Sequence, residues 1–186
     1  QRGGRYRQDK SVTYIYDIFS KKLTEVAPFT VDLLLPSGAE NLNYVLYTDE
    51  SPYKMQREWL DRLPFDIYSV NVHTGAKRLI GRSYRTAPKW SVNGKWAVMY
   101  DPIAQVWNKF DGATGKVVNI SDAIGYPMFM ESYDKPAPAP AYGIAGWTAD
   151  GNNVFLYDAY DWWKIDLTGE RQPECLTKGY GRKHGK

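Results

Sequence analysis

Apolar and polar residues alternate along much of the chain, and the alternation has the period of a β-strand. In the segment that begins at Val12, apolar side chains recur at every second position through Tyr14, Tyr16 and Ile18, whereas a helix would repeat them every three to four residues. Such runs follow one another, separated by Asn-Gly, Asp-Gly, Thr-Gly or Ser-Gly turns. The pattern predicts an all-β fold of many short strands.

One pair of strand-like runs occurs twice without a gap. WSVNGKWAVMYD at 90–101 matches WTADGNNVFLYD at 147–158, and each starts with Trp, turns at Asn-Gly or Asp-Gly and closes on Tyr-Asp. Such a dipeptide supplies the positive φ angles of a tight hairpin turn. We therefore expect a front hairpin whose incoming strand is anchored by Trp90 in one copy and by Trp147 in the other.

A second, rear hairpin follows each front hairpin. It is an aromatic strand that turns at Thr-Gly and returns as a short apolar strand, with copies at 65–80, 104–121 and 161–177 and a copy with a degenerate turn at 12–26. An additional front hairpin at 31–49 turns at Ser37-Gly38. The chain thus holds four rear hairpins and three front hairpins.

A front and a rear hairpin together give a four-stranded antiparallel meander, the unit of a β-propeller blade. The predicted fold is an all-β partial propeller of about 3.5 blades, with a short helical insertion, in a single domain over residues 1–186. The predicted parts are a half blade at 12–26 and blades at 31–80, 87–121 and 142–177. A β-sandwich also uses short strands, but it does not predict a gapless internal repeat.

Residues 51–64 interrupt the first full blade between its second and third strands. Ser51 is a suitable N-cap and Pro52 suits the first helical position, so we expect a short amphipathic helix laid over the blade edge. Its expected packing face is formed by Met55, Trp59 and Leu63. The alternative is that this helix presents Arg57 and Glu58 to a ligand.

The second insertion, at residues 123–141, contains four prolines. Proline favours an extended polyproline-like backbone and is excluded from central strands. A long loop in a compact repeat is either functional or a strap that packs on the blades, and we expect the strap. If the loop contacts a substrate, the candidate residues are Glu131, Tyr133 and Asp134.

Composition narrows the function classes. The net charge of +3 conceals basic ends and an acidic body, since residues 1–10 and 178–186 together carry eight basic side chains and one acidic side chain. We expect solvated ends and no nucleic-acid partner, because binding nucleic acid needs positive charge organised on a folded face.

No apolar run reaches the length of a membrane span. The N-terminus lacks both an initiator Met and the apolar region of a signal peptide, so we expect a processed or excised piece.

The sequence contains no recognisable reactive constellation. His73 precedes a Thr-Gly turn and His184 lies in the basic tail, so we assign neither to catalysis. No nucleophile elbow, zinc motif, P-loop or dinucleotide fingerprint is present. The lone Cys175 excludes an internal disulfide. We expect no catalytic residue, no metal site and no cofactor.

Acidic residues do recur, and a pair of glycosidase carboxylates could be proposed from them. However, Asp111 and Asp166 occupy the same slot in successive units, as do Asp101 and Asp158. A catalytic pair would not repeat in every blade. We therefore assign these carboxylates to turns and strand ends, which disfavours a sugar-processing propeller.

The repeat resembles that of TolB-like propellers. The run at 142–183, with its YGIAGWT and YDAYDWW segments after the Pro-rich loop, resembles the propeller of bacterial prolyl-oligopeptidase-family serine peptidases of the dipeptidyl-peptidase-IV-like branch. The resemblance implies an α/β-hydrolase domain in the same parent chain, a peptide substrate and export to the periplasm. Some relatives bind the peptide amine through a Glu-Glu pair on a helical propeller insertion, and here Arg57-Glu58 stands in its place.

Two functions remain open. The first is a non-catalytic segment that gates or positions peptide for a serine peptidase domain outside this chain. The second is a stand-alone TolB-like propeller that acts as a protein–protein binding module. In either case, a partial ring leaves blade faces and edges uncovered, so we expect another part of the parent protein, or self-association, to cover them.

Overall fold

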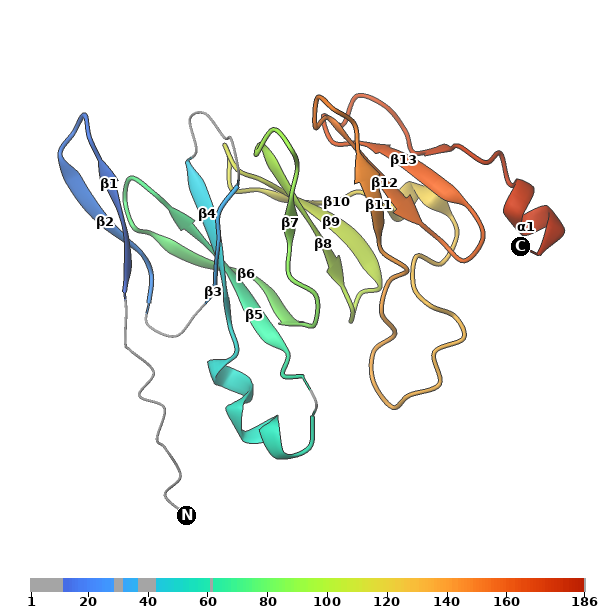
Figure 1. The fold of residues 1–186 in the computed structure, drawn as a ribbon, viewed down its shortest axis with the longest axis horizontal. Helices are drawn as coiled ribbons and strands as arrows, with labels where there is room; N and C mark the ends of the chain where they lie inside the picture. The colour runs from blue at the N-terminus through green and yellow to red at the C-terminus, as the bar shows by residue number, and fades with distance from the viewer. Residues whose placement is uncertain (1–11, 29–31, 37–42, 61, 186) are drawn as a thin grey trace, which may run out of the picture.

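The strands of the computed structural model, which describes residues 12–28, 32–36, 43–60 and 62–185, form four antiparallel sheets. One sheet has two strands and the other three have four each. Figure 1 shows these sheets side by side in chain order, from the two-stranded sheet at one end to the sheet beside α1 at the other. The predicted all-β partial propeller with a helical insertion is confirmed.

Each full blade is a meander in which every strand pairs with the next strand along the chain. The half blade contains β1 (Thr13–Asp17) and β2 (Lys22–Ala27). The first blade contains β3 (Asp32–Leu34), β4 (Tyr44–Asp49), β5 (Phe65–Asn71) and β6 (Lys77–Tyr84). The second contains β7 (Lys89–Trp90), β8 (Trp96–Asp101), β9 (Val106–Asp111) and β10 (Val117–Asn119). The third contains β11 (Ile144–Trp147), β12 (Asn153–Tyr157), β13 (Trp162–Asp166) and β14 (Glu174–Cys175).

Three short helices complete the described residues: η1 (Ser51–Glu58), η2 (Asp122–Ile124) and α1 (Tyr180–His184). No described helix has the length and apolar character needed to cross a membrane. The predicted Ser37-Gly38 turn and the basic segment at 1–10 lie outside the described residues. A single domain over 1–186 stays a prediction.

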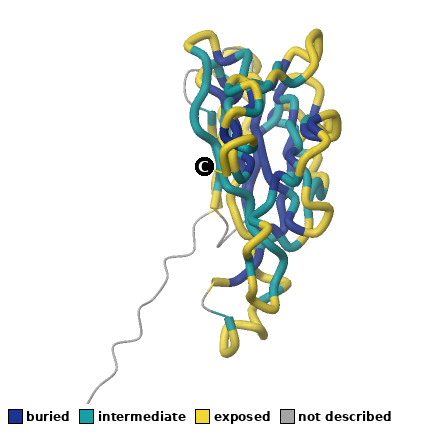
Figure 2. The backbone as a smooth tube through the Cα atoms, turned by 90° about the vertical axis from the view of Figure 1, so that its right-hand side faces the viewer, coloured by how far each residue is buried: buried dark blue, intermediate teal, exposed yellow. Residues whose placement is uncertain are grey.

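The hydrophobic cores lie between neighbouring sheets. In β4, Val45 and Tyr47 pack towards the half blade, whereas Leu46 packs towards the second blade. In β8, Met99 packs towards the first blade and Tyr100 towards the third. Because successive strand residues point to opposite faces, each of these central strands is buried on both sides. Figure 2 shows the buried segments inside the stack and the exposed segments mostly at the turns.

One polar residue closes each rear hairpin, between the last two strands of every blade. The side-chain oxygen of Asp111 accepts hydrogen bonds from the backbone N–H groups of Ala113 (2.8 Å) and Thr114 (3.2 Å). The same slot is filled by Asp17, Asn71 and Asp166. This arrangement is an Asx turn, which fixes the chain reversal locally.

A second set of carboxylates closes the turn that follows the second strand of each full blade. Asp101 accepts the backbone N–H groups of Ile103 and Ala104 at 2.9 Å. Asp158 likewise accepts two backbone N–H groups in the third blade, and Asp49 accepts the N–H of Ser51 in the first. The assignment of the recurring acids to turns and strand ends is confirmed. Asp158 has further partners, which are described below.

The front hairpins differ from the prediction in their backbone. Only the glycines of the two turns, Gly94 (φ 66°) and Gly151 (φ 70°), have positive φ, whereas Asn93 and Asp150 do not. The loop is closed by the N–H of Ser91, which donates to the Trp96 carbonyl at 2.7 Å. The expectation of positive φ at both turn residues was wrong, because a four-residue loop needs only its glycine in the left-handed region.

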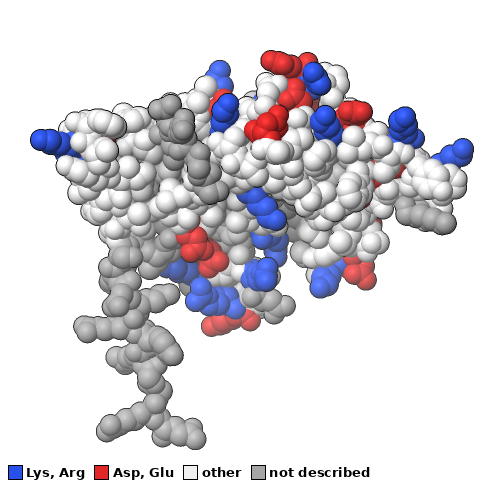
Figure 3. Space-filling view, turned by 45° about the horizontal axis from the view of Figure 1, so that its top comes forward, with Lys and Arg blue, Asp and Glu red and all other residues white. Residues whose placement is uncertain are grey.

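Lysine and arginine side chains tie each blade to the next. Lys22 of the half blade donates to the His73 carbonyl of the first blade. Arg78 of the first blade donates to the Gly115 carbonyl of the second, and Lys109 of the second donates to the Leu167 carbonyl of the third. Figure 3 shows basic and acidic side chains mixed over the face that it draws. These three cations therefore have a structural role between blades.

The predicted helical insertion exists, but its packing differs from the prediction. It is a 3₁₀ helix with Glu50 at the N-cap position and no side-chain cap, so Ser51 is not the N-cap. Trp59 is 76% exposed and Met55 is 85% exposed, so neither is the packing anchor that an α-helical period suggested. Three residues per turn place side chains on different faces than 3.6 residues do. Only Leu63 of the expected face is buried.

The Pro-rich loop packs on the blades as expected. Met128 is buried in the core between the second and third blades, and Phe129 pairs with Ala141 through an isolated β-bridge. The Tyr100 hydroxyl donates to the Ala139 carbonyl at 3.2 Å. These contacts make the base of the loop a strap across that core.

We predict that Asp111→Ala lowers the free energy of unfolding by about 1–2 kcal/mol, because two backbone N–H groups lose their shared acceptor. Asp111→Asn should change it by less than about 0.5 kcal/mol, since Asn71 fills the same slot in the first blade. Urea unfolding followed by circular dichroism measures both variants. Equal losses in the two variants would contradict the Asx-turn assignment.

Candidate functional site

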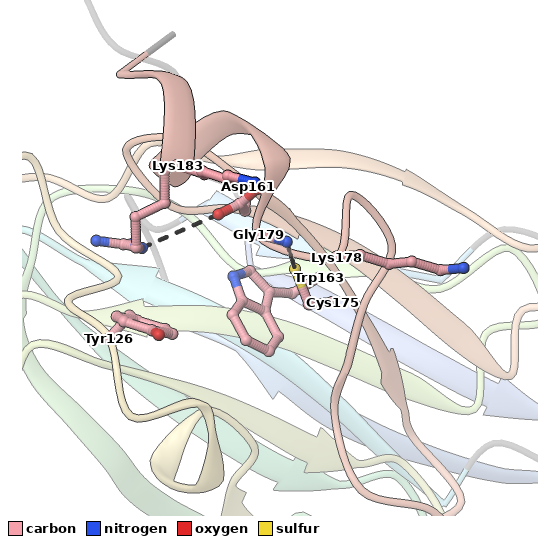
Figure 4. Close-up of a pocket in the computed structure, with 8 residues that line it drawn as sticks. Tyr126, Asp161, Trp163, Cys175, Lys178, Gly179 and Lys183 are labelled. Carbon is pink, nitrogen blue, oxygen red and sulfur yellow. Dashed lines mark hydrogen bonds and ion pairs between the residues drawn. The ribbon is translucent and has the colours of Figure 1, made fainter.

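A pocket with a volume of about 480 Å³ lies beside α1, against the third blade. Its walls come from the Pro-rich loop (Tyr126), from β13 (Trp163) and from the C-terminal segment that carries Arg182 and Lys183. Figure 4 shows Tyr126, Trp163 and Asp161 around the hollow, with Cys175 and Lys178 at its other side. The pocket joins a loop, a blade and the C-terminal segment.

Arg182 is held by two buried carboxylates. One guanidinium nitrogen lies 3.0 Å from Asp158 Oδ2, and another lies 3.9 Å from Asp161 Oδ2. The guanidinium also lies 3.9 Å from the ring centre of Tyr126 and 5.0 Å from that of Tyr160. A planar cation with both carboxylate and aromatic partners is the environment that arginine prefers. The contacts make Arg182 a latch that fixes α1 to the third blade.

Asp158 is the centre of this latch. Burial alone would raise the pKa of Asp158, but four donors outweigh it and hold the pKa below its ordinary value of 3.8. The donors are the backbone N–H groups of Tyr160 and Asp161, the indole N–H of Trp163 and the Arg182 guanidinium. Because each of them favours the charged form, the carboxylate stays ionised although only 4% of the residue is exposed.

The C-terminal segment differs from the solvated tail expected from its charge. Arg182 is paired as described, and His184 is ordered by a 2.8 Å contact from Nδ1 to the Tyr180 carbonyl and by stacking on the Tyr180 ring. Residues Tyr180–His184 of this segment form α1. Charge counting missed the latch because Asp158 and Asp161 lie more than twenty residues away from Arg182.

Cys175 lines the same pocket, and its thiol contacts neighbouring groups of the chain. Its sulfur accepts the backbone N–H of Gly179 at 3.3 Å and lies 3.5 Å from the Thr177 hydroxyl. The thiol thus helps to hold the turn that leads into α1.

A second cavity, which we call the arginine cleft, contains one of the predicted site residues. Its volume is about 660 Å³ and it lies between η1, the start of β5 and the segment after β6. Its polar lining is formed by Glu50, Arg57, Arg62 and Arg85, and its apolar lining by Leu60, Leu63, Phe65 and Ala87. Sequence reasoning selected only Arg57, because Arg62 and Arg85 stand in no motif.

The other predicted site residues do not meet in this cleft. Glu58 is exposed on η1 and does not line it. Glu131 and Asp134 are exposed on the Pro-rich loop, and Tyr133 beside them is half-buried. Their assignment as substrate contacts stays a prediction.

Reactive groups are sparse in the part of the chain that the structure describes. It contains no group of three or more His, Cys, Asp or Glu side chains that could hold a metal ion. His73 is an exposed turn residue, with Nε2 3.2 Å from the Asn43 side-chain oxygen.

No protein-family model and no curated protein matches this sequence. Among solved structures, TolB from Acinetobacter baumannii is similar with a TM-score of 0.41 and 15% identity, over 89% of this chain and 37% of that one. The β-propeller domain of the trilobed protease from Pyrococcus furiosus is similar with a TM-score of 0.37 and 16% identity, over 78% of this chain and 42% of that one. An acylaminoacyl peptidase solved in complex with a chloromethyl ketone is similar with a TM-score of 0.38 and 14% identity, over 78% of this chain and 25% of that one.

The chain spans less than half the length of each of these structures. At such TM-scores and identities, the likenesses carry no functional argument. The fold assignment rests on the sheets, cores and repeated turns described above.

We predict that Asp158→Asn lowers the free energy of unfolding at pH 7 by about 3 kcal/mol, because it leaves Arg182 and the Trp163 indole without their acceptor. The native pKa of Asp158 lies below its ordinary value, so its stabilisation is complete above about pH 5 and is lost as the pH falls through the native pKa. The difference between the wild type and the variant should therefore shrink in acid.

Urea unfolding at several pH values measures this difference, with Asp111→Asn as the control at an exposed Asx turn. A difference that stays constant from neutral pH down to about pH 2 would contradict the role given to the Asp158 charge.

Proposed function

We propose that this chain is a non-catalytic propeller segment that gates or positions peptide substrate for a serine peptidase domain lying outside these 186 residues. The run at 142–183 supports the proposal through its resemblance to propellers of the dipeptidyl-peptidase-IV-like branch. The peptidase domain as a partner and an extracytoplasmic location follow from the same resemblance and belong to the proposal.

The observation that carries a non-catalytic role is the use made of the recurring carboxylates. Asp49, Asp101, Asp111 and Asp166 each accept backbone N–H groups at a turn, and Asp158 is additionally held by Arg182. A general acid or base must be within reach of a substrate proton, whereas these groups are bound to their own backbone. The blades therefore provide a scaffold, and substrate contact is left to the insertions.

The half blade supports the view that further structure adjoins the blades. Ile15 packs towards the first blade, whereas its neighbours Tyr14 and Tyr16, and Leu23 opposite Tyr16, are exposed on the other face. Within the described residues, β1 pairs only with β2. In every full blade the equivalent third strand also pairs with a front hairpin, so we propose that a front hairpin of the parent protein covers β1.

The decisive test is to size the intact gene product and to label it with a fluorophosphonate probe for active-site serines. The proposal predicts a product longer than 186 residues and one labelled serine, which peptide mapping should locate outside this chain. Heat-denatured protein is the control, since labelling of an activated serine needs the folded site.

A native product that ends near residue 186 and takes up no probe would overturn the proposal. In that case the stand-alone TolB-like binding module would be the better assignment, and self-association through β1 would become the natural way to cover the half blade.

A further inference from the structure

The arginine cleft combines excess positive charge with an apolar wall. Among the residues that the structure describes, the charged lining of the cleft consists of one acidic residue, Glu50, and of Arg57, Arg62 and Arg85. The ion pair between Arg57 and Glu50 is long, at 3.8 Å, and both side chains are largely exposed, so it contributes little. Over the described residues, Arg62 and Arg85 form no ion pair. The cleft thus offers guanidinium groups that a ligand can use.

A buried carboxylate below the cleft holds its two sides together. Asp66 is 7% exposed and accepts the Tyr53 hydroxyl of η1 at 2.5 Å and the backbone N–H of Ser83 at 3.1 Å. Tyr53 fixes the helix that carries Arg57, and Ser83 lies two residues before Arg85. Asp66 therefore positions arginines that come from different segments, and it does so without being in the cleft lining.

The hydrogen bond to Asp66 also affects the pKa of the Tyr53 hydroxyl. Burial raises the pKa of the Tyr53 hydroxyl, and the hydrogen bond to Asp66 raises it further. The hydroxyl stays protonated and continues to donate to Asp66 throughout the physiological range. The cleft is thus held in shape by a hydrogen bond that does not compete for its guanidinium groups.

We propose that the arginine cleft binds a peptide through a carboxylate that has an apolar side chain as its neighbour. Arginine presents a planar fork of donors that matches the two oxygens of a carboxylate. Leu60, Leu63, Phe65 and Ala87 supply an apolar surface for the adjacent side chain. The inference rests on the proposed function in one respect, namely that the ligand is a peptide, and it adds acidic character as the substrate class.

The apolar wall is what favours a peptide over a purely anionic ligand. An inorganic anion or a nucleic-acid backbone would use the arginines and leave the apolar lining uncovered. A peptide with a Leu-Asp sequence covers both parts at once. Arg57 then contributes to a site for negative charge, the opposite of the amine recognition expected for a Glu-Glu pair.

The test compares two peptides, acetyl-Leu-Asp-Ala-amide and acetyl-Leu-Asn-Ala-amide, which differ only in charge. Their Kd values are measured by NMR chemical-shift titration of the protein. The Asp peptide should bind about tenfold more tightly, and the preference should fall as salt is added. Arg62→Gln and Arg85→Gln should each weaken binding of the Asp peptide by about five- to tenfold and leave the Asn peptide unchanged.

Two further variants sharpen the result. Glu50→Gln removes the acidic side chain that lines the cleft among the described residues, so it should tighten binding of the Asp peptide about twofold. Arg171→Gln removes an exposed arginine outside the cleft and should change neither Kd. Thermal unfolding by circular dichroism shows that each variant is folded.

Equal Kd values for the two peptides would overturn the inference. It would also be overturned if inorganic phosphate, or a single-stranded oligonucleotide, displaced the Asp peptide at concentrations below that peptide's own Kd, because the site would then recognise any anion. Neither result affects the serine-labelling experiment, so failure of the inference can be told apart from failure of the proposed function.

Discussion

The structure depends on one constraint: central strands such as β4 and β8 are apolar on both faces, so their sheets need a neighbouring sheet on either side. Leu46 and Val45 are adjacent in β4 and belong to different cores, and the same holds for Met99 and Tyr100 in β8. Burying such strands requires stacked sheets, because one layer can cover only one face. The stacking fixes the order of the blades, and it explains why the half blade has an apolar outer face.

Stacking also determines where function can reside. The recurring carboxylates accept hydrogen bonds within the turns at the blade ends. Cations such as Arg78 and Lys109 donate to carbonyl groups of the next blade. Other polar side chains line the arginine cleft beside one insertion and the pocket beside α1. In the pocket beside α1, Arg182 is paired with Asp158, whereas over the described residues Arg62 and Arg85 of the arginine cleft form no ion pair.

The sequence predicted part of the arginine cleft but did not predict the Arg182 latch. It located the helical insertion and selected Arg57, but an α-helical period gave the wrong face for Met55 and Trp59, because the segment is a 3₁₀ helix. Arg62 and Arg85 carried no signal, since they come together only when η1 and the segment after β6 meet at Asp66. The Arg182 latch was hidden for the same reason. Its partners are distant in sequence, and charge counting treats the tail as solvated.

The sequence by itself determined the repeat and therefore the fold: period-two alternation gives strands, and the positions of Gly94 and Gly151 locate the turns between them. The recurrence of Asp111 and Asp166 in one slot likewise sufficed to assign them to turns. Only the tertiary structure decided which charges meet. Contacts such as Arg182 with Asp158, or Tyr53 with Asp66, depend on how segments pack, and packing is a property of the whole stack that no short stretch of sequence encodes.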